Sequence, residues 1–393
     1  MNTVVIGYLY NNNGMATWCI EAAKALASKD YNVILVKHKS IELLDLQVTN
    51  ITIVDYEYPN NSNKSIIQKI FNKLKNNFYL IPFYHPTDSF LQNLTIQLSS
   101  MGINSVDAFL LNQSNLFNKF ISVKQYIVAW ANPPYLINYL KNAITTSISF
   151  NQKVNALLQA IYWYKSDIFS YQNASGVFTV SEKLTQNIQQ LTTNSIYTVY
   201  PGVFNSFNIN PITPMNNKVK IVMMALHVEE KRKRLVWVIE QIKKIKTCYS
   251  LIEITLIGEY TNLYKSTLEQ LNMPIKFLGK LDRKDALNEL AKNDLMIFAS
   301  SVDDWGYVQI EAMSRGLAVL APNSSPFDEI VGDNDYLFSV TNDIDFINKF
   351  NHIILNPSKL QNDKKVFFDR YQYKFSGDIF GTQLSSIINH QSN

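Results

Sequence analysis

Acidic residues and a glycine gather in the stretch from residue 295 to 316, LMIFASSVDDWGYVQIEAMSRG. Its apolar start predicts a buried strand, and the apolar residues after Gly306 recur at helical spacing. A helix start presents unpaired N–H groups and a positive dipole end, which suits a phosphate group. The carboxylates of Asp303, Asp304 and Glu311, the last expected in the first helical turn, can accept hydrogen bonds from hydroxyl groups. The stretch therefore predicts a binding site for a nucleotide sugar.

A basic cluster, Lys231-Arg-Lys-Arg234, follows a strand expected to end near Leu226. Cations at such a position could stabilise the negative charge that develops on a departing diphosphate. For Arg232, Lys233 and Arg234, a solvated helix start is a comparable interpretation.

No pattern of a metal centre or nucleophile is evident in the sequence. Neither the histidines (His38, His85, His227, His352 and His390) nor the two cysteines (Cys19 and Cys248) show ligand spacing. The acidic pairs Asp333/Asp335 and Asp343/Asp345 are better interpreted as solvated turn carboxylates than as cation ligands. We therefore expect no metal and no cofactor apart from the nucleotide sugar itself.

Length and composition bound the fold and the partners. The 393 residues, 47% of them hydrophobic, are enough for two domains with a core each. A formal charge of +4 argues against dedicated nucleic-acid binding. Because the N-terminus lacks a basic and apolar leader and no apolar run approaches the length of a membrane span, we expect a cytoplasmic protein.

Residues 61–80 have apolar side chains at helical spacing among lysines that include Lys64, Lys69, Lys73 and Lys75. A helix packed on its own domain with a solvated lysine face is the favoured interpretation. Peripheral contact with an anionic inner membrane face stays open as the alternative.

The order of elements favours an α/β fold with doubly wound parallel sheets. In the first half we expect strands at 3–9, 32–37, 108–111, 126–129 and 176–180, helix 17–28, and a helix capped by Ser181. Gly14 ends an expected loop, either as a loop or cap glycine or as a point of close approach to a ligand. In the second half we expect strands at 219–226, 252–257, 275–278, 295–299 and 318–321, helices at 235–246 and 284–291, and a helical tail. The expected domains are 1–204 and 218–370, joined by linker 205–217, with a tail, 371–393, that packs back on the first domain.

Several short motifs occur in a fixed order between Lys218 and about Val340. They are Ile257-Gly258, Phe277-Leu-Gly279, Asp294, Trp305-Gly306 and Glu311-Ala-Met-Ser-Arg-Gly316. In this order the chain resembles the nucleotide-binding domain of retaining glycosyltransferases of the GT-B architecture, family 4. The resemblance is weaker in the first part, where Val180-Ser-Glu182 and Tyr200-Pro-Gly-Val203 match the family's markers.

The resemblance implies two Rossmann-like domains that face a cleft, and it implies roles for single residues. Glu311 would bind the ribose hydroxyls, Asp303 would contact the donor sugar from a position where the family usually has glutamate, and Lys231 would contact the diphosphate. The remaining residues expected at the donor are Gly14, Arg232, Arg234, Gly258, Asp304, Trp305, Gly306 and Tyr307.

Two departures from the family pattern bear on turnover. Leu226 stands where the family has a phosphate-binding arginine, and Asn132 follows the strand 126–129 where family members often have a histidine. An amide can donate hydrogen bonds but cannot carry a proton as imidazole does, and His85 is an alternative source of that function.

The implied reaction is transfer of a sugar, with retention and without metal, from a UDP- or GDP-linked donor to a glycan, lipid-linked or protein acceptor. The alternative is a catalytically weakened GT-B subunit that acts as a binding partner of an active glycosyltransferase. A GT-B epimerase or phosphorylase is less favoured.

Overall fold

The computed structural model of the chain describes residues 2–9, 14–38, 49–56, 94, 96–103, 105–111, 123–129, 164, 167–204 and 218–390. The chain divides into two compact units. The first consists of Met1–Val199 together with Gly381–Asn393, and the second of Tyr200–Phe380. The linker expected at 205–217 lies outside the described residues.

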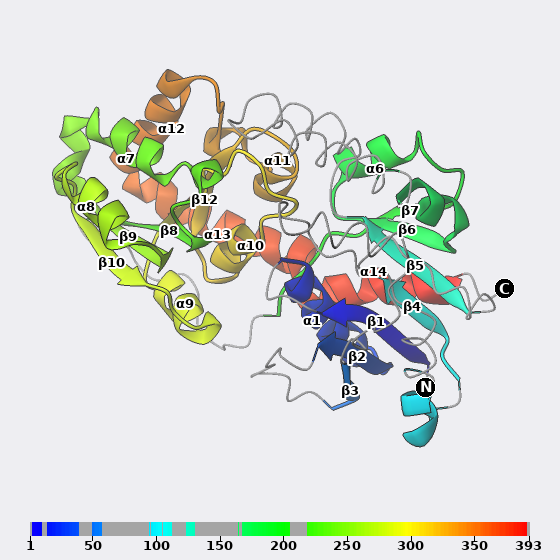
Figure 1. The fold of residues 1–393 in the computed structure, drawn as a ribbon. Coiled ribbons are helices and arrows are strands. Elements are labelled where there is room, and N and C mark those ends of the chain that lie inside the picture. Colours follow the sequence, from blue (N-terminus) through cyan, green and yellow to red (C-terminus); the bar gives the residue numbers. More distant parts are fainter. Residues whose placement is uncertain are drawn as a thin grey trace, which may run out of the picture. The chain divides into compact units, whose positions relative to one another are not determined.

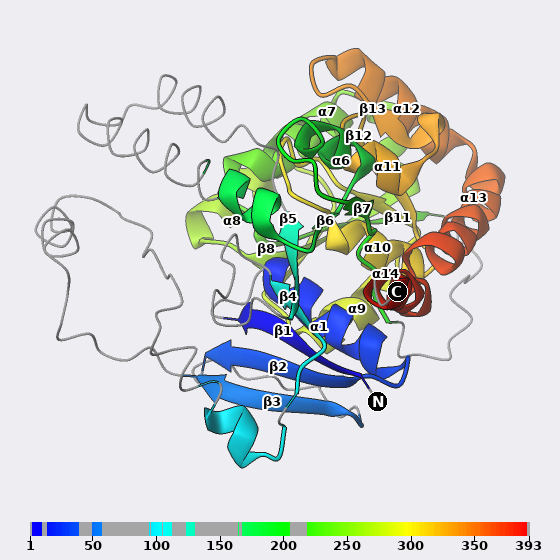
Figure 2. The same ribbon diagram turned by 90° about the vertical axis from the view of Figure 1, so that its right-hand side faces the viewer.

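The first unit is built on a parallel sheet with the strand order β3-β2-β1-β4-β5-β6-β7. Its central strands are short, buried and rich in β-branched residues, as is typical of a sheet covered on both faces. The register places Val5 opposite Ile34 on one side and opposite Phe109 on the other. Figure 2 shows β1, β2 and β3 side by side at one end of this sheet. The strands are β1 (Thr3–Leu9), β2 (Asn32–His38), β3 (Ile51–Tyr56), β4 (Ala108–Leu111), β5 (Lys124–Ala129), β6 (Gly176–Thr179) and β7 (Ile196–Thr198).

Helix α1 (Gly14–Ala27) packs against β1, β2 and β3 through a face rich in alanine. It begins three residues before the predicted start at residue 17, so Gly14 is its first residue and not part of the loop. A Cβ at Gly14 would meet no atom within 4 Å, so packing does not require glycine there. Helix α6 (Glu182–Ile188) confirms the predicted cap, because the Ser181 hydroxyl accepts a hydrogen bond from the backbone N–H of Leu184 at 3.2 Å.

The last helix, α14 (Gly377–His390), completes the first unit with its residues from Gly381 onward. Lys124 Nζ, at the start of β5, donates to the carbonyl oxygen of Ile388 at 3.1 Å. A Cβ at Gly381 would lie 2.5 Å from the carbonyl oxygen of Ala25. Glycine at 381 therefore lets α14 approach the backbone of α1 closely.

The second unit has a parallel sheet with the order β10-β9-β8-β11-β12-β13. Its strands are β8 (Val219–His227), β9 (Ile252–Glu259), β10 (Ile275–Gly279), β11 (Leu295–Ile297), β12 (Ala318–Pro322) and β13 (Leu337–Phe338). Gly258 in β9 has a positive φ of 140°, and a Cβ there would lie 1.8 Å from the carbonyl oxygen of Ala225. The close approach of β8 and β9 therefore requires glycine at position 258. The contact of Gly258 with a ligand stays a prediction.

Helices connect the strands of the second unit (Figure 1). They are α7 (Leu235–Lys243), α8 (Asn262–Glu269), α9 (Arg283–Leu290), α10 (Tyr307–Ser314), α11 (Phe327–Val331), α12 (Asp343–Leu355) and α13 (Pro357–Arg370). Three 3-10 turns, η2 (Lys231–Lys233), η3 (Lys246–Leu251) and η4 (Asn334–Tyr336), and a π turn, η5 (Tyr371–Phe375), complete the described part. Helix α7 packs with α12, whereas α10 packs with α9, α11 and α13. The helical tail is confirmed from residue 343 to residue 390.

A buried ion pair ties α13 to this sheet. Asp294, just before β11, accepts a hydrogen bond from Lys364 Nζ at 2.8 Å and another from the backbone N–H of Lys220 at 3.0 Å. The Lys364 side chain is 0% exposed and that of Asp294 7%. The aspartate of the sequence motif is therefore a structural anchor of β8, β11 and α13.

Both sheets confirm the predicted doubly wound α/β class. In the second unit β9 and β10 lie on one side of β8, and β12 and β13 lie beyond β11. The direction of winding thus reverses between β8 and β11. The carboxyl ends of two strands at such a reversal form the crevice in which doubly wound sheets bind ligands.

Candidate functional site

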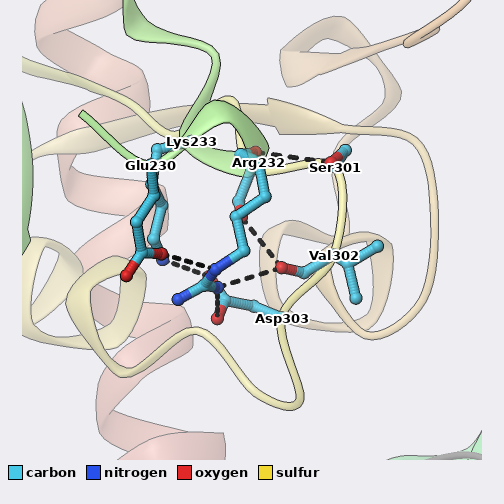
Figure 3. A network of polar contacts seen from close by, with 7 residues as sticks. Glu230, Arg232, Lys233, Ser301, Val302 and Asp303 are labelled. Carbon is cyan, nitrogen blue, oxygen red and sulfur yellow. Dashed lines mark hydrogen bonds and ion pairs between the residues drawn. The ribbon is translucent and has the colours of Figure 1, made fainter. Parts of the chain in front are cut away.

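The turn after β8 and the loop after β11 meet at this reversal through one carboxylate. Asp303 Oδ1 lies 2.5 Å from Arg232 Nη1, and Asp303 Oδ2 lies 2.6 Å from Lys233 Nζ (Figure 3). Asp303 is 24% exposed, Lys233 15% and Arg232 42%. In the free protein, two residues of the basic cluster therefore bind the carboxylate that was predicted to contact the donor sugar.

Arg232 makes further contacts that hold this arrangement. Its Nε lies 2.6 Å from Glu230 Oε2, and Nη1 donates to the carbonyl oxygen of Val302 at 3.1 Å. Its own carbonyl oxygen accepts from the backbone N–H of Ser301 at 2.8 Å (Figure 3). Burial lowers the pKa of Arg232, but the carboxylates of Asp303 and Glu230 outweigh that effect and the pKa is raised. The loop 301–303 is thus fastened to η2 by backbone and side-chain contacts.

Lys231, like Arg232, is an exposed cation of this turn. In the part of the chain that the structure describes, no ion pair of its side chain is found. Leu226, at the end of β8, is 54% exposed, and the neighbouring His227 Nδ1 lies 3.4 Å from Glu259 Oε2. Lys231 is therefore the basic residue of the cluster best placed to receive an anionic ligand.

Arg234 is engaged elsewhere. It is the residue before α7, with a left-handed φ of 55°, and its Nη2 donates to the carbonyl oxygen of Val340 at 3.2 Å. Its guanidinium carbon lies 3.9 Å from the ring centroid of Trp237. The structure does not bring Arg234 to Asp303, and its contact with the donor stays a prediction.

Asp304 lies next to the paired Asp303. Asp304 is an exposed residue, but the neighbouring protein atoms still displace part of the water around its carboxyl group. Desolvation and, to a smaller extent, the charge of Asp303 raise the pKa of Asp304 to about 6, against the opposite effect of Arg232. The pKa of Asp304 therefore lies well above the ordinary value of an aspartate.

Trp305 and Gly306 are the last two residues of the loop before α10, and both are buried. Trp305 is 3% exposed, and its ring centroid lies 5.8 Å from that of Tyr200 and 6.1 Å from that of Phe375. A Cβ at Gly306 would lie 2.3 Å from Nε2 of the fully buried Gln309. Glycine at 306 lets the Gln309 amide pack against the loop. Tyr307 is the first residue of α10.

Glu311 lies deeper in the helix than predicted. Helix α10 begins at Tyr307 with Gly306 as its cap, so Glu311 is in the second turn and not in the first. Its side chain is 11% exposed, and Oε1 lies 2.9 Å from Nη2 of Arg283, the first residue of α9. An ionised carboxylate can accept hydrogen bonds from hydroxyl donors in addition to an ion pair.

Other predicted residues cannot be placed. Asn132, His85 and the lysine-rich segment 61–80 lie outside the described residues. The acidic pairs are accounted for by local structure, because Asp333 accepts from the backbone N–H of Asp335 and Asp343 lies in the first turn of α12. Among the described residues, no group of three or more metal-ligating side chains is found. None of the described helices is long and apolar enough to cross a membrane.

Arg283 and Lys233 are site residues that the sequence motifs did not identify. Arg283 precedes Glu311 by a whole α/β segment, and no spacing rule connects the two. Lys233 belonged to the basic cluster, but the motif assigned the phosphate role to Lys231 alone. In both cases the pairing depends on tertiary structure.

Comparison with known proteins gives the same fold. Residues 206–366 match the family profile described as Glycosyl transferases group 1. The chain is similar over 99% of its length to 99% of a sucrose-phosphate synthase from Thermosynechococcus elongatus, with 13% identity and a TM-score of 0.69. It is similar over its full length to all of a glycosyltransferase from Rickettsia africae ESF-5, with 14% identity and a TM-score of 0.65.

A third similar structure is a mutant of S. aureus TarM in complex with Fondaparinux, alpha-GlcNAc-glycerol and UDP. It is 12% identical, with a TM-score of 0.64, and the match covers 99% of this chain and 100% of that one. No curated protein matches the chain by sequence. These neighbours confirm the GT-B fold class, and the second unit carries the segment that matches the group 1 glycosyltransferases.

Proposed function

We propose that this chain, whose residues 206–366 match the group 1 glycosyltransferases, transfers a sugar with retention from a nucleotide diphosphate sugar to an acceptor hydroxyl. The observation that carries the proposal is the position of Glu311, a nearly buried carboxylate on the helix that follows β11. The direction of winding reverses between β8 and β11, and doubly wound sheets bind ligands at such a reversal. In this proposal Glu311 accepts hydrogen bonds from the ribose hydroxyls.

The diphosphate would lie between Lys231 and the start of α10. The first N–H groups of a helix lack intrahelical partners and favour an anion, and Lys231 is exposed in the turn that follows β8. As the bond to the sugar breaks, negative charge grows on the diphosphate, and fixed positive groups stabilise it. We propose that Lys231 supplies this charge, so that the transfer is independent of a metal.

In the proposed reaction the acceptor hydroxyl attacks the anomeric carbon from the face that the diphosphate leaves. The bond between the anomeric carbon and the diphosphate oxygen breaks, the bond to the acceptor oxygen forms, and the configuration at the anomeric carbon is retained. The acceptor proton passes to the departing phosphate oxygen. Positioning of the two substrates then supplies a large part of the rate acceleration.

Asp303 and Asp304 are the carboxylates proposed to face the donor sugar. Each oxygen of Asp303 already binds a cation, but a carboxylate oxygen has two lone pairs and can accept a sugar hydroxyl as well. We propose a UDP- or GDP-linked donor and a glycan, lipid-linked or protein acceptor. The UDP in the similar TarM complex supports the first of these donors.

Sugar transfer and donor hydrolysis from a panel of UDP-, GDP- and dTDP-sugars test the proposal. We expect one donor to be consumed by the wild type, and both Glu311→Ala and Lys231→Ala to lower the rate strongly. Lys243→Ala, which removes an exposed lysine at the end of α7, is the matched control and should keep the wild-type rate. The product's anomeric configuration, measured by NMR, tests retention.

Leu226 at the usual arginine position is the observation behind the alternative of a weakened binding subunit. Tight donor binding without turnover for any acceptor would support that alternative. The family match and the full-length glycosyltransferase neighbours do not favour it. No nucleotide binding at all would contradict both functions.

A further inference from the structure

We propose that Arg283 is a positioning residue of the donor site, which orients the Glu311 carboxylate for recognition of the ribose hydroxyls. The inference rests on the proposed function, because it deepens the role of Glu311. It adds a residue from α9, an element in which the sequence motifs identify no donor contact. Arg283 is proposed to act through Glu311 and not on the sugar or the phosphates.

The geometry between α9 and α10 supports this role. Arg283 Nη2 lies 2.9 Å from Glu311 Oε1, and α9 packs against α10. Arg283 is 41% exposed, whereas Glu311 is only 11% exposed. The ion pair thus joins a partly exposed cation to a nearly buried carboxylate. A charge-assisted contact to a nearly buried carboxylate is stronger and more directional than one at the surface.

The start of α9 fixes the position of Arg283. Asp282 caps this helix, because its Oδ1 accepts a hydrogen bond from the backbone N–H of Asp285 at 2.8 Å. Arg283 follows directly as the first helical residue, so its backbone is held by the cap. Only the side-chain torsions of Arg283 then have to become ordered for its guanidinium group to reach Glu311.

A second guanidinium makes the orientation of Glu311 dependent on Arg283. Arg315, 5% exposed at the end of α10, lies close enough for both Glu311 and Arg283 to act on it electrostatically. The Glu311 carboxylate is thus attracted by Arg315 as well as bound by Arg283, and loss of Arg283 changes the balance between the two.

Arg283 leaves Glu311 able to bind a diol. An ionised carboxylate has about four lone-pair positions, so the contact with Arg283 does not by itself prevent Glu311 from accepting hydrogen bonds from a diol. Two neighbouring hydroxyl groups need one position each. The free protein therefore presents an oriented acceptor, so loss of Arg283 should weaken recognition of the 2′-hydroxyl group more than recognition of the diphosphate.

Calorimetric titration with paired ribo- and 2′-deoxyribonucleoside diphosphates tests the inference. The probes are UDP and dUDP, GDP and dGDP, ADP and dADP, and CDP and dCDP, titrated into the full chain. For the pair that binds, we expect the wild type to prefer the ribonucleotide by about tenfold or more, as for a hydrogen bond to a charged group.

In Arg283→Gln the preference for the ribonucleotide should fall to about threefold or less, because a carboxylate that Arg283 no longer orients forms a weaker hydrogen bond with the 2′-hydroxyl group. Arg283→Lys keeps the charge but lacks the planar guanidinium group. Its preference for the ribonucleotide should lie between those of the wild type and Arg283→Gln. Lys284→Gln, which removes the exposed lysine of the next position, should keep the wild-type preference. Thermal melting of each variant shows whether it is folded.

The outcomes separate the two proposals. If the wild type binds none of the eight nucleotides, the proposed function fails and this inference fails with it. If the wild type binds with a ribose preference that both Arg283 variants retain, only the role of Arg283 is overturned. An equal loss of affinity for both members of a pair would show a merely structural role and would likewise overturn it.

Discussion

Arg232 Nη1 lies 2.5 Å from Asp303 Oδ1, so the turn after β8 and the loop after β11 are joined by an ion pair. The sequence motifs assign these two segments to different parts of the donor, the cations to the phosphates and the carboxylate to the sugar. In the structure the two groups bind each other, and Lys233 binds the second carboxylate oxygen. Their contributions to donor binding should therefore be coupled.

Asp303→Asn should weaken donor binding more than it weakens the fold. Its ionic partners are partly exposed, so we expect a loss of less than about 1 kcal/mol per pair in the free energy of unfolding. The donor KM should rise, because the loop 301–303 loses the ion pairs that hold it against η2. Denaturant unfolding and donor kinetics measure the two effects. Lys244→Ala, which breaks the exposed Lys244–Asp343 pair, should leave the kinetics unchanged.

A double-mutant cycle extends this test. If Arg232 and Asp303 act as a unit, Arg232→Ala should add little to the donor KM of Asp303→Asn. Additive effects of the two substitutions would contradict the coupling.

Leu226→Arg should strengthen donor binding. Leu226 is 54% exposed, so the substitution neither leaves a cavity nor buries a charge, and it restores a cation at the end of β8. We expect the donor KM to fall, with the gain shrinking as salt is added, since the attraction is electrostatic. Leu263→Arg, at a leucine of α8 that is 79% exposed, is the control. Equal effects of both substitutions would indicate a general charge effect.

Lys364→Met should destabilise the second unit strongly. The substitution leaves the Asp294 carboxylate nearly buried without its cation, and loss of one partner of a buried pair costs about 3 to 5 kcal/mol. Denaturant unfolding measures the loss. Lys365→Met, at the exposed neighbouring position, should have little effect. A stability of Lys364→Met close to that of the wild type would disprove the anchoring role of the pair.

Asp304 should make stability fall as pH rises toward neutrality. Its pKa is raised from 3.8 to about 6 in the folded chain, so the folded state binds more protons than the unfolded state between these values. This contribution is fully present below about pH 4 and is lost as pH rises through about 6. In Asp304→Asn the fall in Tm between pH 5 and pH 7 should be smaller, whereas Asp369→Asn should follow the wild type. Identical profiles of wild type and Asp304→Asn would count against the shifted pKa.

Apolar periodicity was enough to predict the doubly wound class, because the buried strands carry unbroken apolar runs. It failed at β3 and α8. Ile53 in β3 is 37% exposed, and α8 buries only Leu268, so both segments contribute little to the core. Weak burial at the edges of a sheet leaves little pattern to detect.

The sequence motifs named residues of the candidate site but not their contacts. The motif order singled out Glu311 and Asp303 as candidates, because helix starts and strand ends have local signals. It assigned Glu311 to the first turn although the helix starts where expected, after Gly306, because the fifth residue of a helix already lies in the second turn. The pairs Arg283–Glu311 and Arg232–Asp303 join segments far apart in the chain, and no local rule connects them.

A crystal structure of the chain with a bound nucleoside diphosphate tests the central claim most directly. The account predicts ribose hydroxyls within hydrogen-bond distance of the Glu311 carboxylate, and the diphosphate beside Lys231 and the first N–H groups of α10. A nucleotide bound at any other place, with Glu311 untouched, would contradict the account.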